Sequence, residues 1–152
     1  MSVQLYKIIF DKNSLELNDD YDRLSEYEKE VISSMSVDAF FDYDNLYDLY
    51  TCFLITDEHT IRSYISILKN NFVKHEIINI SKDAILNHFN FEKELENLLD
   101  PTSRIKFNIF IDSVNDWIFE HLDIDIVLDR INEVGGIQNL RQIEKKFLKN
   151  YK

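Results

Sequence analysis

Short runs rich in β-branched and aromatic residues mark the first half of the chain and predict strands. These runs are Val3–Phe10, Tyr50–Ile55 and Val73–Ile80. Between the last two runs, apolar residues recur at helical spacing, and Thr56 or Asp57 can cap the helix that they predict. The predicted apolar stripe is Ile61, Tyr64, Ile65 and Leu68. This order of elements predicts a βαβ unit over residues 50–80, with its two strands parallel in one sheet.

A capping box predicts an earlier helix that begins near Ser25. The Ser25 hydroxyl can accept a hydrogen bond from the backbone N–H of Glu28, whose carboxylate can reach back to Ser25. The apolar residues at helical spacing are Leu24, Tyr27, Val31, Ile32 and Met35. The acidic segment 15–22 that precedes this helix predicts a loop.

The stretch FFDYDNLYDLYTCFLIT, residues 40–56, alternates aromatic residues with carboxylates before an apolar run. A helix through residues 43–50 would place on one face Tyr43, Leu46, Tyr47 and Tyr50. Asp44 and Asp48 would then lie about a quarter to a third of a turn away from that face. The pattern therefore favours an amphipathic helix that leads into a buried strand. The acidic face of this helix remains a candidate contact surface.

From Ser81 onward the pattern is mostly helical. Ser81 can cap a helix over Lys82–Phe89, and a second helix over Phe91–Leu99 ends at Asp100-Pro101. Residues 105–111 also fit the alternation of a strand, but the longer window to 121 fits one helical face, which favours a helix. The residues on that face are Phe107, Phe110, Ile111, Val114, Trp117 and Ile118.

Two further helices are predicted at the C-terminal end. The first covers Ile124–Val134 and is closed by a left-handed cap at Gly135-Gly136. Its inward residues are Ile124, Val127, Leu128 and Ile131. The second starts at Asn139, with Leu140, Ile143, Phe147 and Leu148 inward.

The predicted fold class is α+β (mixed), with a small sheet of about three strands and a helical C-terminal half. We expect a single domain over residues 1–152, in which 124–152 form a C-terminal helical hairpin. With 45% hydrophobic residues among 152, the chain can bury a sizeable core. No apolar run approaches the ~18 residues that span a bilayer. The start shows no secretory signal, and the single Cys52 cannot form an internal disulfide, so we expect a cytoplasmic protein.

The net charge of −11 is concentrated at the front of the chain. Residues 1–50 hold 12 Asp/Glu and 4 Lys/Arg, whereas residues 101–152 hold 8 of each. Negative potential repels phosphate backbones, so we expect no nucleic-acid partner. The same negative potential attracts basic proteins. The alternative explanation is that the acidic surface serves only to keep the protein soluble.

Recognisable catalytic and metal motifs are absent from the sequence. An EF-hand loop from Asp42 would need an oxygen ligand, a glycine and a glutamate where the chain has Leu46, Tyr47 and Phe53. The acids Asp123, Asp125 and Asp129 fit a helix cap and an exposed helix face. The four histidines lack ligand spacing, and glycine only at 135 and 136 excludes phosphate-binding loops. We therefore predict no cofactor, no metal and no catalytic residue.

The segment LDRINEVGGIQNLRQIEKKFLKNYK, residues 128–152, resembles a short C-terminal helical-hairpin tail of otherwise unrelated bacterial proteins. The shared features are a helix of the LD-[RK]-I-[NS]-E type, a glycine turn, Asn139-Leu140 and the run at 144–148. Arg141-Gln142 departs from the pattern, which has a Ser/Thr-rich cap followed by acids. The resemblance implies packing or docking and carries no activity.

These observations favour a non-catalytic cytoplasmic protein-interaction domain that docks an acidic surface on a basic protein. An immunity-type or inhibitor protein is the concrete form of this hypothesis. The predicted partner-binding residues are Asp42, Tyr43, Asp44, Tyr47 and Asp48. The alternatives are a structural or regulatory subunit held by the C-terminal hairpin, or a small enzyme of another type. The sequence does not predict an oligomeric state.

Overall fold

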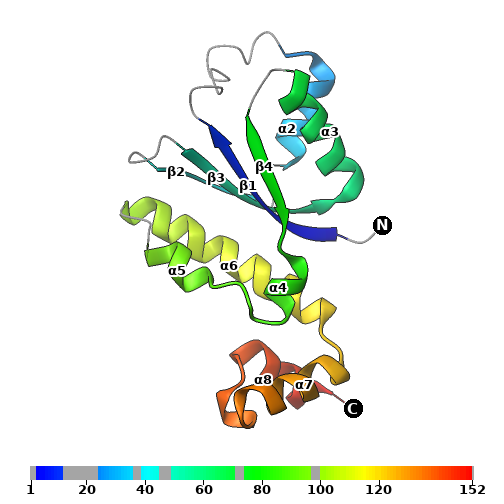
Figure 1. Cartoon of the computed structure of the whole chain (residues 1–152), viewed down its shortest axis with the longest axis vertical. Coiled ribbons are helices and arrows are strands. Elements are labelled where there is room, and N and C mark those ends of the chain that lie inside the picture. Colours follow the sequence, from blue (N-terminus) through cyan, green and yellow to red (C-terminus); the bar gives the residue numbers. More distant parts are fainter. Residues whose placement is uncertain are drawn as a thin grey trace.

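The computed structural model describes residues 3–11, 24–35, 39–44, 49–70, 74–96 and 100–151. The strands are β1 Val3–Asp11, β2 Ala39–Asp44, β3 Leu49–Asp57 and β4 His75–Asn79. The helices are α2 Glu26–Met35, α3 Glu58–Asn70, α4 Ser81–Ile85, α5 Phe91–Glu96, α6 Pro101–His121, α7 Ile124–Val134 and α8 Gln142–Asn150, with a 3₁₀ turn at Ile137–Asn139. The α+β class and the helical C-terminal half are confirmed (Figure 1).

One four-stranded sheet has the order β2-β3-β1-β4, and each neighbouring pair is antiparallel. Because β3 and β4 each pair with β1, they run in the same direction, as a βαβ unit requires. They are not neighbours, however, since β1 lies between them. Local sequence signals cannot reveal this insertion, because it depends on pairing between residues 38 to 73 positions apart.

The fourth strand comes from the stretch for which a helix was predicted. The predicted helix over residues 43–50 is wrong: Tyr43 and Asp44 end β2, and Leu49 and Tyr50 begin β3. The backbone register pairs residue 40 with 53 and residue 43 with 50. An isolated helix of only eight residues is marginal in water, whereas pairing with β3 satisfies the backbone groups of β2.

Alternation along the central strands distributes their side chains between two cores. Leu5 and Phe53 pack with residues of α4, α6 and α7 on one face of the sheet. Tyr6, Ile8 and Leu54 pack with α3 and Val31 of α2 on the other face. Figure 1 shows α4 and α6 on one side of the sheet and α2 and α3 on the other, with α7 beyond the end of α6. The sheet is therefore buried on both faces over much of its area.

Helix α6 confirms the helical interpretation of residues 105–121. Asp100 caps it, because a side-chain oxygen accepts from the Ser103 backbone N–H at 3.0 Å, and Pro101 occupies the first helical position. Asp100-Pro101 thus starts a helix. The buried residues are Phe107, Phe110, Val114, Trp117 and Ile118. Ile105 and Ile109 are exposed, so the alternation that resembled a strand comes from apolar residues on two sides of one helix.

Several of the predicted helix ends are confirmed by direct hydrogen bonds. The Ser25 hydroxyl accepts from the Glu28 backbone N–H at 3.1 Å, and Asp57 accepts from the Thr60 backbone N–H at 2.7 Å. Gly135 adopts the left-handed conformation, with φ of 80°, at the end of α7. The Thr60 N–H bond is the main reason that the pKa of Asp57 is lowered.

The predicted cap at Ser81 is wrong. Ser81 is the first residue of α4, and its hydroxyl accepts from the Leu5 backbone N–H at 2.9 Å and donates to the Leu5 carbonyl at 3.3 Å. The hydroxyl therefore joins α4 to β1, and the backbone N–H of Ser81 is bound by the Asn79 side chain at 3.0 Å. A contact between residues 76 positions apart leaves no local signature.

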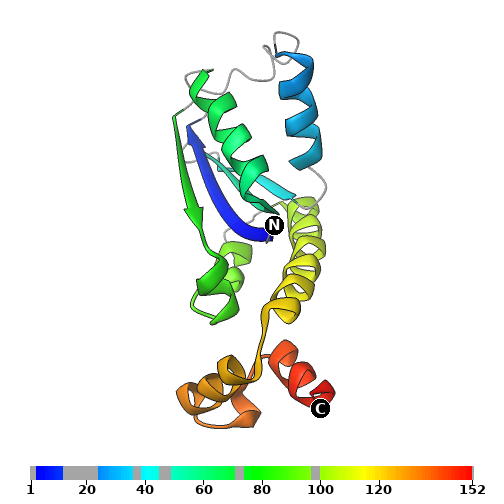
Figure 2. The same ribbon diagram turned by 90° about the vertical axis from the view of Figure 1, so that its right-hand side faces the viewer.

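The C-terminal helices lie beyond the end of α6 (Figure 2). The last helix begins at Gln142 instead of Asn139, because residues 137–139 form the 3₁₀ turn. Leu128 was expected inward but is exposed, whereas Val127 is fully buried. The predicted loop at 15–22 and the last residues of the predicted helix 91–99 lie outside the described residues.

Phe53 provides a test of the core. Its ring is buried and lies 5.8–6.4 Å from the rings of Phe89, Phe91, Phe107 and Phe110. We expect Phe53→Ala to lower the free energy of unfolding by about 3–5 kcal/mol, because it leaves a cavity between the sheet and α6. Leu128→Ala, at an exposed position, should change it by less than about 0.5 kcal/mol. Urea denaturation followed by circular dichroism measures both, and similar losses for the two variants would contradict the burial described here.

Candidate functional site

The predicted partner-binding residues fall partly on the edge of the sheet. Asp42, Tyr43 and Asp44 belong to β2, which is an outermost strand, and Tyr47 and Asp48 lie outside the described residues. The structure thus places the first three on an extended backbone instead of a helix. Their role in binding stays a prediction.

The only cysteine has no nucleophilic setting. Cys52 is fully buried in β3, and burial raises the pKa of its thiol well above the ordinary value. Catalytic thiolates need partial exposure and a positive environment. Cys52 therefore acts as a small apolar core residue.

Two of the histidines make contacts within the fold. His121 Nδ1 lies 2.8 Å from the Trp117 carbonyl, and its ring lies 4.4 Å from that of Trp117. His88 Nε2 lies 3.1 Å from a carboxylate oxygen of Glu133. Within the described residues, no three His, Cys, Asp or Glu side chains are grouped so that they could hold a metal ion. Asp123 is the cap of α7, as predicted, since it accepts from the Ile126 backbone N–H at 2.8 Å.

An acidic and aromatic surface occurs on α2. Glu26, Tyr27 and Glu30 are all exposed there, and the exposed fraction of Tyr27 is 58%. Residues three and four positions apart are neighbours on a helix, so the Glu30 carboxylate lies on the same side as the Tyr27 ring, whereas the Glu26 carboxylate forms an ion pair with Lys29 at 3.7 Å. The Tyr27 hydroxyl is 3.1 Å from the Ser63 hydroxyl of α3, which holds the ring in place.

Tyr27, which falls at helical spacing with Val31, does not share its burial. Helical spacing alone placed it with Val31, but the tyrosine lies at the margin of the contact between α2 and α3. A tyrosine can bind a neighbouring helix through its hydroxyl while its ring stays in contact with water. The sequence signal that could have identified this surface is the pattern of carboxylates at Glu26, Glu28 and Glu30 around the ring.

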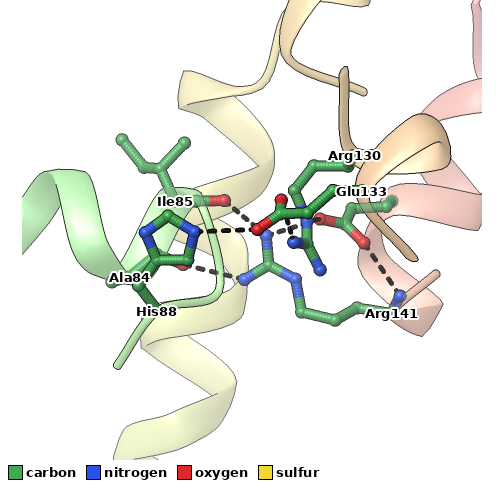
Figure 3. Close-up of polar contacts among 7 residues, drawn as sticks. Ala84, Ile85, His88, Arg130, Glu133 and Arg141 are labelled. Atoms are coloured by element: carbon green, nitrogen blue, oxygen red, sulfur yellow. Dashed lines mark hydrogen bonds and ion pairs between the residues drawn. The ribbon is translucent and has the colours of Figure 1, made fainter. Parts of the chain in front are cut away.

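A network of charged side chains lies between α7 and α8 (Figure 3). Glu144 is fully buried and Arg130 is 5% exposed. Glu144 accepts from Arg130 Nε at 3.1 Å, from Arg141 Nη2 at 2.7 Å and from the Arg141 backbone N–H at 2.8 Å. The buried carboxylate therefore has three donors from two arginines, which is the condition for keeping such a charge inside a protein.

The same network joins the C-terminal helices to α4. Arg141 donates to the carbonyls of Ala84, at 2.8 Å, and Ile85. Glu133 binds both Arg130 and His88, which follows α4. Figure 3 shows the Arg141 guanidinium reaching the end of α4, where helix carbonyls lack partners within their own helix. Arg141 departs from the tail that the segment resembles, and it is the residue that makes this connection.

The pKa values in the network reflect the balance between burial and pairing. Burial opposes the charged form of Glu144, but the hydrogen bonds and charges of Arg141 and Arg130 outweigh burial and lower its pKa. Burial likewise acts to lower the pKa of Arg130, and its bonds to Glu133 and Glu144 raise it. The Glu133 pKa is lowered mainly by its hydrogen bond to Arg130 and then by that to His88. Arg130, Glu133 and Glu144 are therefore charged and paired at neutral pH, which indicates a structural role.

Comparison of the chain with protein-family models, curated proteins and solved structures finds no match. Among the described residues, no helix has both the length and the apolar character needed to cross a membrane.

The buried carboxylate is tested by Glu144→Gln, which keeps the shape and removes the charge. Arg130 and Arg141 then lose their shared buried counter-charge, so we expect the free energy of unfolding at neutral pH to fall by about 3 kcal/mol. The control is Glu120→Gln, an exposed position on α6, with an expected change below about 0.5 kcal/mol. Equal effects of the two substitutions in urea denaturation would contradict a stabilising network.

The network also predicts a dependence of stability on pH. Because the Glu144 pKa in the folded chain is below the ordinary value of 4.5, its stabilising contribution is complete above that value and is lost as the pH falls through the folded value. On acidification from neutral pH to about pH 3, the original chain should thus lose more stability than Glu144→Gln. Parallel denaturation curves at each pH measure this difference, and identical losses would show that Glu144 is not paired as described.

Proposed function

We propose that the protein is a non-catalytic interaction domain whose acidic N-terminal third docks on a basic protein. The observation that carries the proposal is the exposed group Glu26, Tyr27 and Glu30 on α2. Tyrosine is enriched at protein interfaces, because its rigid ring offers a large contact area at low entropic cost. The exposed Glu30 carboxylate on the same side favours a partner that presents arginine or lysine.

Electrostatics support the same partner class. The first 50 residues carry a net charge of −8, from 12 acidic and 4 basic side chains. A field of this sign speeds association with a positively charged cleft and selects against acidic partners. An immunity-type or inhibitor protein that covers the basic active site of a nuclease or similar toxin in the cytoplasm is the concrete form that we propose. Asp42, Tyr43, Asp44, Tyr47 and Asp48 remain the second candidate contact group.

A structural or regulatory subunit is the alternative, and one observation favours it. The C-terminal hairpin exposes Leu128, Ile137 and Tyr151, which are large apolar side chains outside the acidic surface. Docking through this end would leave α2 without a role. The two functions therefore predict different sites of contact.

Binding to the partner tests the proposal through matched charge variants. We expect a tagged chain to retain one stoichiometric partner at low salt and to release it as salt is raised, because screening weakens an acidic contact. The combined change Glu26→Gln, Tyr27→Ala and Glu30→Gln should weaken binding at least tenfold, since interface tyrosines often contribute more than 1.4 kcal/mol. Quantitative pull-down and biolayer interferometry measure the recovery and the association rate.

The control is Asp125→Asn with Asp129→Asn, which removes two exposed carboxylates from α7. This variant should bind as the original chain does. A parallel variant, Asp42→Asn, Asp44→Asn and Asp48→Asn, assigns any remaining loss to the second contact group. Binding that survives both N-terminal variants but is lost on deletion of residues 136–152, with the circular dichroism spectrum showing that the rest of the chain stays folded, would replace the proposal by the subunit alternative.

A further inference from the structure

Helix α6 carries apolar side chains on both of its sides. Phe107 and Phe110 are buried against the sheet, whereas Ile105 and Ile109 are 62% and 64% exposed. The two isoleucines lie one helical turn apart on the outer side. Figure 2 shows the outer side of α6 at the edge of the molecule, and no other helix or strand of the described residues lies over it. Ile105 and Ile109 are therefore the large apolar side chains that α6 leaves exposed.

Charges are arranged in order along this outer side. Arg104 and Lys106 flank Ile105 at the N-terminal end of the helix, and Asp112 and Asp116 follow Ile109 toward the C-terminal end. All four are exposed. The spacing of 105, 109, 112 and 116 places the isoleucines and the two carboxylates on one stripe. The stripe is therefore basic at one end, apolar in the middle and acidic at the other end.

We propose that this stripe, Arg104–Asp116, is the interface between two copies of the chain, with the two α6 helices packed antiparallel. A two-fold axis near the isoleucines brings Ile105 of each copy against the partner's Ile109. It also brings Arg104 and Lys106 of each copy close to the partner's Asp112, so both attractions occur twice. Parallel packing would set Arg104 against the partner's Arg104 and Asp112 against the partner's Asp112, and like charges oppose that arrangement.

The dimer is independent of the docking surface on α2. The α6 stripe lies on the opposite side of the sheet core from α2, because α6 packs with one core cluster and α2 with the other. The charge order also distinguishes a second copy from a purely basic partner. A basic partner would meet Asp112 and Asp116 favourably but would be repelled by Arg104 and Lys106.

Analytical ultracentrifugation of the full chain over a wide concentration range tests the proposal. The original chain should show a reversible monomer–dimer equilibrium. Ile105→Ser combined with Ile109→Ser should raise the dissociation constant about a hundredfold or more, since it removes four large apolar contacts from the dimer. Leu128→Ser, at an exposed apolar position on α7, is the matched control and should leave the constant unchanged. A chain that stays monomeric throughout, or a dimer that tolerates the double serine change, overturns the proposal.

Charge reversal tests the antiparallel arrangement and does not depend on loss of folding. One variant carries Arg104→Glu and Lys106→Glu, so its stripe is acidic at both ends. The other carries Asp112→Lys and Asp116→Lys, so its stripe is basic at both ends. Each alone should be monomeric with an unchanged circular dichroism spectrum, and an equimolar mixture should form a 1:1 heterodimer. Absence of that heterodimer, or dimers of either variant alone, overturns the pairing of opposite ends.

Discussion

The packing of Phe53 against the aromatic residues of α5 and α6 is the constraint on which the arrangement of the chain depends. Phe53 comes from β3, and its contacts with Phe107 and Phe110 hold the sheet against α6. Lys7 of β1 lies over the Phe53 ring at 5.6 Å and binds Glu94 of α5 at 3.0 Å. Each contact joins segments far apart in the sequence. The cluster thus fixes α6, and α6 in turn determines where the last helices lie.

A second constraint operates at the other end of α6, and its chemistry is different. Here the C-terminal helices are joined by a buried carboxylate that two arginines share, and Arg141 also binds the open end of α4. Apolar contact alone lets two helices slide along each other. A buried ion pair forms in only one geometry and therefore fixes the position of one helix relative to the other. Burial of a charge costs free energy unless every bond is made, so this end of the fold tolerates little displacement. The residues that this segment shares with the tails that it resembles build the hairpin, while Arg141 joins the hairpin to α4.

Local chemistry made much of the fold predictable, and contacts between distant residues account for the errors. Asp57, Ser25 and Gly135 were predicted correctly because each cap involves atoms within a few residues. Tyr43 and Ser81 were assigned wrongly because their positions depend on β3 and on Leu5, respectively. Tyr27 shows the limit of periodicity, since helical spacing does not reveal where a neighbouring helix ends. The sequence therefore located the candidate site only within the acidic N-terminal third of the chain. The exposure of the Tyr27 ring on α2 could not be predicted, because it depends on how α2 packs against α3.

The two proposed surfaces use acidity in different ways. On α2, an exposed tyrosine lies among carboxylates of which Glu26 is paired with Lys29, and the negative field comes from the excess of acidic residues in the first third of the chain. On α6, equal numbers of basic and acidic residues flank two isoleucines, so the attraction is local and self-complementary. Long-range repulsion between chains of net charge −11 opposes dimer formation, and close apolar contact has to outweigh it. A dimer through α6 would present two copies of the α2 surface, and a partner with two basic sites would then bind more tightly than either contact allows alone.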